Sequence, residues 1–199
     1  MSQLAYSSVP AWARTPGRST PTNTALPDTT GRFYVLVGVG DPHAPSVQSQ
    51  STSDDPSAVD LVRGWTQTLD PGVGRSVLLG DQVDTLAAQL RDTLRTSAVG
   101  VRVVLAGPVG SCLRLRATAI DAGLEDDEIS VVPVGTGPVD VFCSHCRTTT
   151  HSVAAVDDVI CCDGCDRDLL VYYHVSRRTG AFLGFMVDAE TAPSGGATR

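Results

Sequence analysis

Two pairs of cysteines near the C-terminus constrain this chain more than any other feature. Cys143 and Cys146 form one C-x2-C pair, Cys162 and Cys165 form a second, and 15 residues separate them. A C-x2-C knuckle directs two sulfurs at one ion, and two knuckles complete a tetrahedron with metal–sulfur distances of about 2.3 Å. The spacing therefore predicts a structural metal site held by these four cysteines.

A fifth cysteine leaves the identity of one ligand open. Cys161 directly precedes Cys162, so a C-x3-C arrangement with Cys165 would use Cys161 in its place. The two-residue gap of the first knuckle favours Cys162. The sixth cysteine, Cys112, lies beside an apolar stripe of helical spacing and is expected in the core.

Four thiolates leave no open coordination position for a substrate or a water molecule, so we expect structural zinc rather than a catalytic metal. Iron in the same four sulfurs, as in a rubredoxin-like electron carrier, satisfies the same geometry and remains an alternative. A Rieske cluster is excluded, because Cys165 stands where the second histidine ligand would be needed.

Upstream of the cysteines, apolar β-branched runs alternate with segments of helical periodicity. The runs cover residues 33–39, 76–79, 101–106 and 129–134, and the helical stripes between them cover 59–69, 83–94 and 113–124. Continuous apolar runs are typical of parallel strands that are covered on both faces. Ser57 and Asp60 have the spacing of a capping box at the first helix. The order predicts an α/β domain over residues 32–135 with an open four-stranded parallel sheet.

Composition divides the rest of the chain. Residues 1–31 are rich in Ser, Thr and Pro and predict an irregular arm, and residues 41–56 predict a mobile loop. Residues 135–138 read as a linker, 139–190 as a small β zinc-ribbon module with strands at 169–175 and 182–187, and 191–199 as a flexible tail. A module of this size has a thin core, which is why it needs a metal staple.

Two weaker patterns are candidate binding sites. Gly107, Pro108 and Gly110 follow the third apolar run and open a helix, where a nucleotide or another anion can bind at the helix N-terminus. A tight strand-to-helix turn requires the same residues.

The second pattern combines His174, Ser176, Arg177 and Arg178, whose paired guanidinium groups suit a phosphate or the carboxylates of a partner. Solvated turn residues are the alternative. His174 alternates with Tyr172 along the expected strand and is predicted to be half-buried.

Charge and hydropathy exclude several functional classes. The formal net charge of −7 opposes nucleic-acid binding, which needs a basic face to neutralise phosphates. No apolar run approaches the roughly 18 to 20 residues that cross a bilayer, and the first residues lack the pattern of a signal peptide. We therefore expect a cytoplasmic protein, where clustered cysteines bind metals more often than they form disulfides. No Ser-His-Asp, paired-carboxylate or Walker signature is present, so no catalytic residues are expected.

The C-terminal third carries a longer pattern. It reads Phe142-Cys-x2-Cys146, Cys162-x-Gly-Cys165, Leu169-x-Val171-x2-His174-x-Ser176-Arg177-Arg178-x2-Ala181-x-Leu183-Gly184-Phe185 and Asp188-Ala189-Glu190. This pattern resembles the C-terminal domain of the DmmA-like family. Members of that family are subunits of dimethylamine monooxygenase, an enzyme that is also described as haem-dependent oxidative N-demethylase. The resemblance spans residues 32–190. It implies a non-catalytic or assembly subunit of a complex that converts dimethylamine to methylamine and formaldehyde, with haem in one partner subunit and flavin with an iron–sulfur cluster in another.

The first domain is also similar to the nicotinamide-binding half of ferredoxin reductases. In those enzymes a strand ends in Cys-Gly-Pro before a helix, and here Ala106 precedes Gly107 and Pro108. The resemblance implies a Rossmann-like sheet, but the cysteine near the nicotinamide ring is replaced and no flavin-binding barrel precedes the domain. Hydride transfer by this chain is therefore not expected. A rubredoxin-like carrier and, as a third class, a free-standing zinc-ribbon adaptor are the alternatives to the subunit hypothesis.

Overall fold

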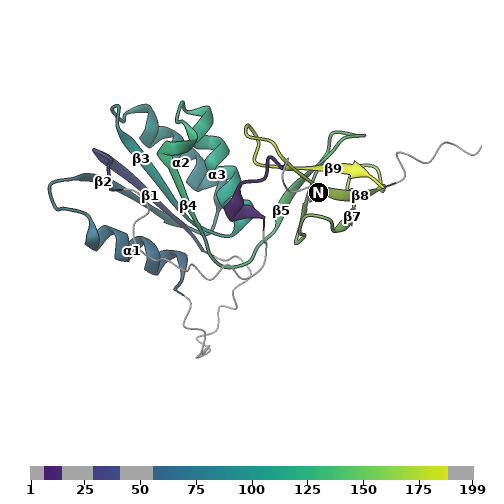
Figure 1. Cartoon of the computed structure of the whole chain (residues 1–199), viewed down its shortest axis with the longest axis horizontal. Coiled ribbons are helices and arrows are strands. Elements are labelled where there is room, and N and C mark those ends of the chain that lie inside the picture. The colour runs from purple at the N-terminus through teal and green to yellow at the C-terminus, as the bar shows by residue number, and fades with distance from the viewer. Residues whose placement is uncertain (1–6, 15–28, 41–55, 188–199) are drawn as a thin grey trace, which may run out of the picture.

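The structure is a computed structural model that describes residues 7–14, 29–40 and 56–187. Two lobes lie side by side, one a sheet covered by helices and the other a smaller all-β lobe (Figure 1). Most of the predicted arm, nearly all of the loop predicted at 41–56 and the whole tail at 191–199 lie outside the described residues. The predicted domain boundaries stay predictions.

The first lobe is built on a parallel sheet. Its strands are β1 (Phe33–Val39), β2 (Gly74–Gly80), β3 (Val101–Gly107) and β4 (Ile129–Pro133), in the order β2-β1-β3-β4. All three pairings are parallel, which confirms the predicted four-stranded parallel sheet. The central strands β1 and β3 bury nearly every residue, because helices cover both faces of the sheet.

Helix α1 (Ala58–Thr68) covers one face, and α2 (Val83–Arg95) and α3 (Val109–Asp121) cover the other (Figure 1). The predicted capping box starts α1: the Ser57 Oγ accepts a hydrogen bond of 3.1 Å from the Asp60 amide. Trp65 is buried against the sheet. Leu124, predicted at the end of the third helix, lies beyond α3 but packs into the same core.

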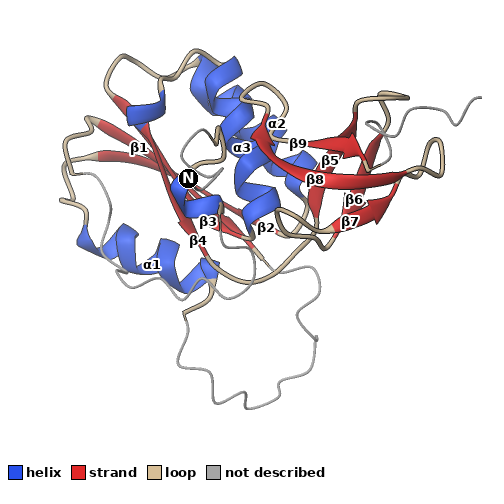
Figure 2. Cartoon of the chain, turned by 45° about the vertical axis from the view of Figure 1, so that its right-hand side comes forward, coloured by secondary structure: helices blue, strands red, loops and turns tan. Residues whose placement is uncertain are grey.

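The second lobe is a mixed five-stranded sheet (Figure 2). Its strands are β5 (Val139–Cys143), β6 (Thr149–Ser152), β7 (Val159–Cys161), β8 (Asp168–Val175) and β9 (Phe182–Met186), in the order β6-β5-β9-β8-β7. The α/β class with a second, smaller β unit is thus as predicted. Sequence reasoning found β8 and β9 and missed the other three, because strands of three to five residues are too short to show a clear pattern.

Residues 7–14 pack between the two lobes. The Ser7 Oγ donates a hydrogen bond of 2.9 Å to the Tyr173 carbonyl, and Val9 is buried in the core of the second lobe. Trp12 contacts the cores of both lobes. This part of the predicted arm is therefore docked and joins the two sheets.

The longest described helices, α2 and α3, have 13 residues, fewer than the roughly 20 apolar residues that a transmembrane helix needs.

The junction between the lobes depends on a missing side chain at Gly110. A Cβ there would overlap the Pro138 carbonyl oxygen and lie 2.9 Å from the Val139 Cα, both backbone atoms that cannot rotate away. We expect Gly110→Ala to lower the free energy of unfolding by about 1–3 kcal/mol, the usual cost of overpacking. Urea unfolding followed by circular dichroism measures the change.

Gly64→Ala is the matched control, because Gly64 lies inside α1 and a Cβ there meets no atom within 4 Å. This substitution should raise stability by about 0.5–1 kcal/mol through helix propensity. Equal stability of the two variants would contradict the role given to Gly110.

Candidate metal centre

Four cysteines converge at one end of the second sheet. Cys143 ends β5, Cys146 lies in the following turn, and Cys162 and Cys165 lie in the turn between β7 and β8. Their sulfurs all lie within 4.8 Å of one another, with 3.9 Å between Cys143 and Cys165 and 3.5 Å between Cys146 and Cys162. Tetrahedral zinc with Zn–S bonds of about 2.3 Å requires sulfur–sulfur edges of about 3.8 Å. The donor set and its spacing fit a tetrathiolate metal.

The two knuckles are built alike. The Arg147 amide donates to the Cys143 carbonyl and the Asp166 amide to the Cys162 carbonyl, each at 3.0 Å. Arg147 and Asp166 both adopt left-handed backbone conformations, with φ of 67° and 55°. A backbone amide also approaches the first sulfur of each knuckle, Cys146 N at 3.5 Å from Cys143 Sγ and Gly164 N at 3.4 Å from Cys162 Sγ. These amides stabilise negative charge on the sulfurs.

Gly164 and Thr148 allow the knuckles to approach each other. A Cβ on Gly164 would overlap the Thr148 Oγ1 and lie 3.1 Å from the Cys146 Sγ. Hydrogen bonds from the side chain and backbone of Thr148 lower the pKa of Cys146 to about 6. Sequence reasoning missed Thr148, because the spacing of the cysteines does not mark it.

The surroundings of Cys165 oppose its ionisation. Desolvation raises the pKa of Cys165 to about 12, and its hydrogen bonds with the neighbouring thiols act in the same direction. A bound divalent ion removes the protons of its thiol ligands, because only the thiolate coordinates.

The structure separates the other two cysteines from this cluster. Cys161 ends β7 opposite Asp168 and is exposed, outside the group of four. Cys112 is fully buried, as expected for a core residue, and its thiol lies 3.4 Å from the Gly107 carbonyl. Burial raises the pKa of the Cys112 thiol to about 12.

The glycines of the candidate nucleotide turn have packing roles. Gly107 has φ of 151°, and a Cβ there would lie 2.8 Å from the Val39 Cβ. The linker residue Gly137 passes close to Pro108, and a Cβ added to Gly137 would lie 3.0 Å from the Pro108 Cβ. Nucleotide binding stays a prediction.

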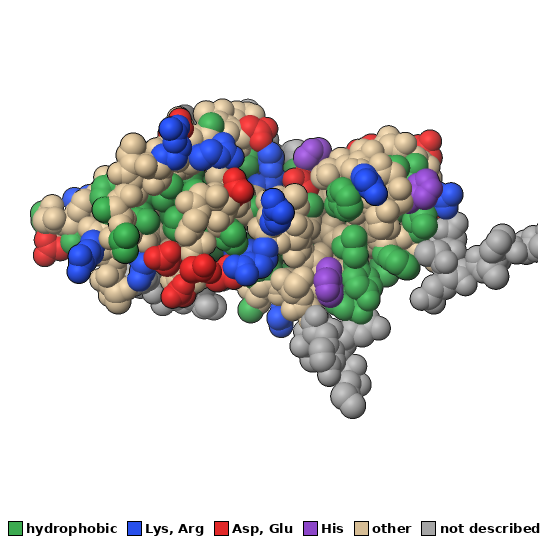
Figure 3. Space-filling model, turned by 90° about the horizontal axis from the view of Figure 1, so that it is seen from above, with side chains coloured by type: hydrophobic (Ala, Val, Ile, Leu, Met, Phe, Trp, Pro, Cys, Tyr) green, Lys and Arg blue, Asp and Glu red, His purple; other side chains and the backbone are tan. Residues whose placement is uncertain are grey.

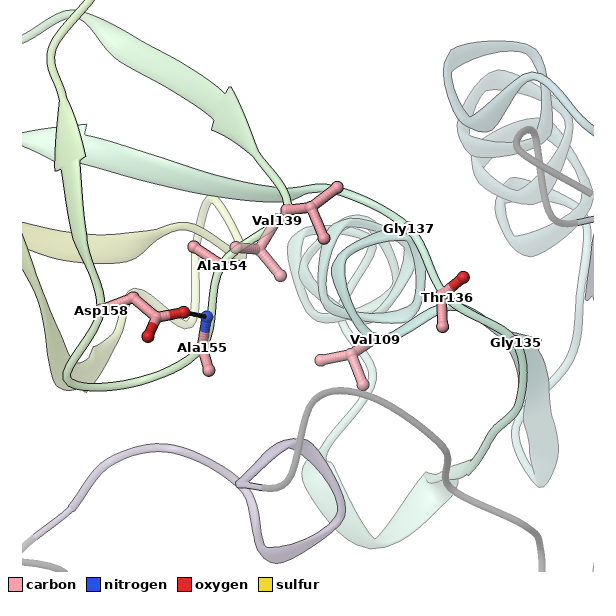
Figure 4. A pocket seen from close by; sticks show the side chains of 9 residues that line it. Val109, Gly135, Thr136, Gly137, Val139, Ala154, Ala155 and Asp158 are labelled. Atoms are coloured by element: carbon pink, nitrogen blue, oxygen red, sulfur yellow. Dashed lines mark hydrogen bonds between the residues drawn. The ribbon is translucent and has the colours of Figure 1, made fainter.

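A cavity lies beside this turn, between Val109, the linker and residues 153–155 (Figure 4). Its volume is about 180 Å³, below the roughly 300 Å³ at which pockets for drug-sized ligands begin. Asp158, on its wall, already accepts a hydrogen bond of 2.7 Å from the Ala155 amide.

Of the four candidate partner-contact residues, His174 lies near the end of β8, and Ser176, Arg177 and Arg178 lie in the turn between β8 and β9. His174 is exposed, so its predicted half-burial is wrong: nothing in the described part of the chain covers this side of β8. The Ser176 carbonyl accepts a hydrogen bond of 2.8 Å from Gly180 and closes the turn. The Arg177 guanidinium lies 2.9 Å from the Asp126 carboxylate of the first lobe. Arg178 lines a separate open groove between the lobes.

Comparison with known proteins gives a match over most of the second lobe. Residues 140–185 match the family model described as dimethylamine monooxygenase subunit DmmA-like, C-terminal domain. Over 108 residues the chain is 37% identical to the haem-dependent oxidative N-demethylase delta subunit of Ectopseudomonas mendocina (strain ymp), a match that covers 54% of this chain and 61% of that relative. No solved structure matches the chain, so the likeness to ferredoxin reductases stays a prediction. The resemblance to the DmmA-like family is confirmed, and the family model places it in residues 140–185.

Proposed function

We propose that this chain is a non-catalytic or assembly subunit of a haem-dependent oxidative N-demethylase that converts dimethylamine to methylamine and formaldehyde. The observation that carries the proposal is the closed four-sulfur cluster within the segment that matches a family of such subunits. The relative that is 37% identical over 108 residues is the delta subunit of a haem-dependent oxidative N-demethylase. Haem, flavin and an iron–sulfur cluster belong, in this proposal, to the partner subunits.

Zinc is the metal that we assign to the cluster. Cys143, Cys146, Cys162 and Cys165 would hold it, and zinc binding by four thiolates supplies on the order of 10–16 kcal/mol of folding free energy. Gly164 and Thr148 bring the knuckles together, and the backbone amides at Cys146 and Gly164 stabilise the charge on the sulfurs. With four protein ligands the ion has no position for a substrate. The metal would therefore shape a surface and take no part in the reaction.

Nothing else among the described residues forms a second group of three or more metal-binding side chains. The buried Cys112 thiol, with its raised pKa, is a poor nucleophile. These observations support a subunit whose contribution is assembly. A reducing cytoplasmic location, which keeps the thiols available to the metal, is part of the same proposal.

The metal assignment predicts about one zinc per purified chain and no visible chromophore. Cys162→Ser should lose most of the zinc and unfold at a lower temperature, because one of four ligands is gone. Cys161→Ser is the matched control and should keep the zinc content and the unfolding temperature of the wild type, since the Cys161 side chain lies outside the cluster. Elemental analysis by mass spectrometry and thermal unfolding measure both quantities. A red protein with iron–thiolate absorbance would favour the rubredoxin-like carrier instead.

The subunit assignment predicts a stable complex. When the chain is co-expressed with the haem subunit and with the flavin and iron–sulfur subunit, it should co-elute with at least one of them in size-exclusion chromatography. Omitting the chain should lower the yield of assembled complex while leaving the haem spectrum of the haem subunit unchanged. Elution of the chain apart from every partner would refute the proposal.

A further inference from the structure

The second sheet has two apolar faces, and the described residues cover only one. Side chains on the inner face, among them Val141, Val171 and Phe182, belong to the core of the lobe. The alternating side chains on the opposite face form cross-strand rows that the pairing register defines: Phe142 beside Leu183, and Val159, Leu170 and Phe185 in line across β7, β8 and β9. Tyr172 continues the face along β8. We call these six residues the outer face.

The outer face is exposed to an unusual degree for apolar residues. Val159 is 54% exposed, Phe185 39% and Phe142 37%. Two shallow hollows, of about 540 and 360 Å³, lie on it and share Leu183. Figure 3 shows hydrophobic side chains gathered on the second lobe beside a histidine. A sheet face left to solvent normally carries polar side chains, and an apolar patch with a polar border is typical of a protein interface.

Negative charge borders the outer face along its edge strand. The residues from 157 to 168, which form β7 and the second knuckle, include five aspartates and a single arginine. All five aspartates are exposed: Asp157, Asp158, Asp163, Asp166 and Asp168. Asp157 also lines the larger hollow with Val159 and Leu170. A partner surface that is complementary to this edge must carry Lys or Arg.

The opposite border differs. His174 lines the smaller hollow next to Phe142 and Leu183. Arg177, beyond the end of β8, is held by Asp126 of the first lobe. Within the described residues the five aspartates of the β7 edge form no ion pair, whereas the charge of Arg177 is paired with Asp126.

We propose that the outer face is the docking surface for another subunit of the complex, and that this partner presents an apolar centre with a Lys- or Arg-rich border opposite β7. The proposal rests on the proposed subunit function. It adds which face of this chain makes the contact and which charge the partner's surface carries. The outer-face side chains supply the apolar burial, and the aspartates orient the partner and speed its approach.

Phe185→Glu tests the apolar centre. Because the side chain is already partly exposed and lies on the face away from the core, zinc content and unfolding temperature should stay close to wild type. Affinity for the purified partner subunits, measured by biolayer interferometry, should fall at least about tenfold, since a carboxylate would be buried in the contact. Val99→Glu, at a position 95% exposed in the first lobe, is the matched control and should bind like wild type.

The possible outcomes separate the two proposals. If the wild-type chain binds a partner and Phe185→Glu binds equally well, the docking face is wrong and the subunit function stands. If the wild-type chain binds no partner, both are overturned. A wild-type dimer that Phe185→Glu dissociates would assign the face to a second copy and also refute the proposed occupant.

Charge variants test the border. Asp157→Asn combined with Asp168→Asn should slow association about three- to tenfold at low salt, and the difference should shrink at high salt. Asp92→Asn combined with Asp127→Asn removes the same charge from the first lobe and should leave the rate near that of wild type. Equal rates for the two double variants would show that no basic border faces β7.

Discussion

The convergence of four sulfurs is the constraint on which the second lobe depends. Cys143 and Cys146 lie at the end of β5, whereas Cys162 and Cys165 lie between β7 and β8. In the sheet order, β9 and β8 separate β5 from β7. One ion bound by the four sulfurs would therefore tie the turn after β5 to the turn between β7 and β8, across β9. A lobe of about 50 residues buries too little surface to hold such an arrangement by packing alone.

The inner face of this sheet follows from the same constraint. Cys143 and Cys162 are fully buried and pack in one core with Val9 of the N-terminal segment and Leu113 of α3. The cluster thereby fixes which side of the sheet meets the first lobe, and the alternation of the strands turns the remaining apolar side chains outward. A metal held by all four sulfurs would have no open position and would give the lobe shape rather than chemistry, which suits the assembly role that we propose.

Several features could be predicted because the signal was local. Apolar runs and helical stripes indicated the first sheet and its three helices, and Ser57 with Asp60 marked the start of α1. The residues that sequence reasoning did not predict correctly are those whose contacts or burial depend on segments distant in the sequence. Thr148 is one of them, because its side chain lies where a Cβ on Gly164 of the second knuckle would be placed. His174 was expected to be half-buried, and it is exposed because the described residues leave that side of β8 uncovered.

The sequence by itself determined the kinds of structure present: a parallel sheet, from the period of its apolar residues, and a tetrathiolate pattern, from the spacing of two cysteine pairs. The tertiary structure decided that Cys162 joins the cluster while Cys161 ends β7 outside it, and that Arg177 pairs with Asp126. It also decided which face of the second sheet is left open. The physical reason is that alternation places neighbouring side chains on opposite faces, but only the packing of other elements determines which face is buried.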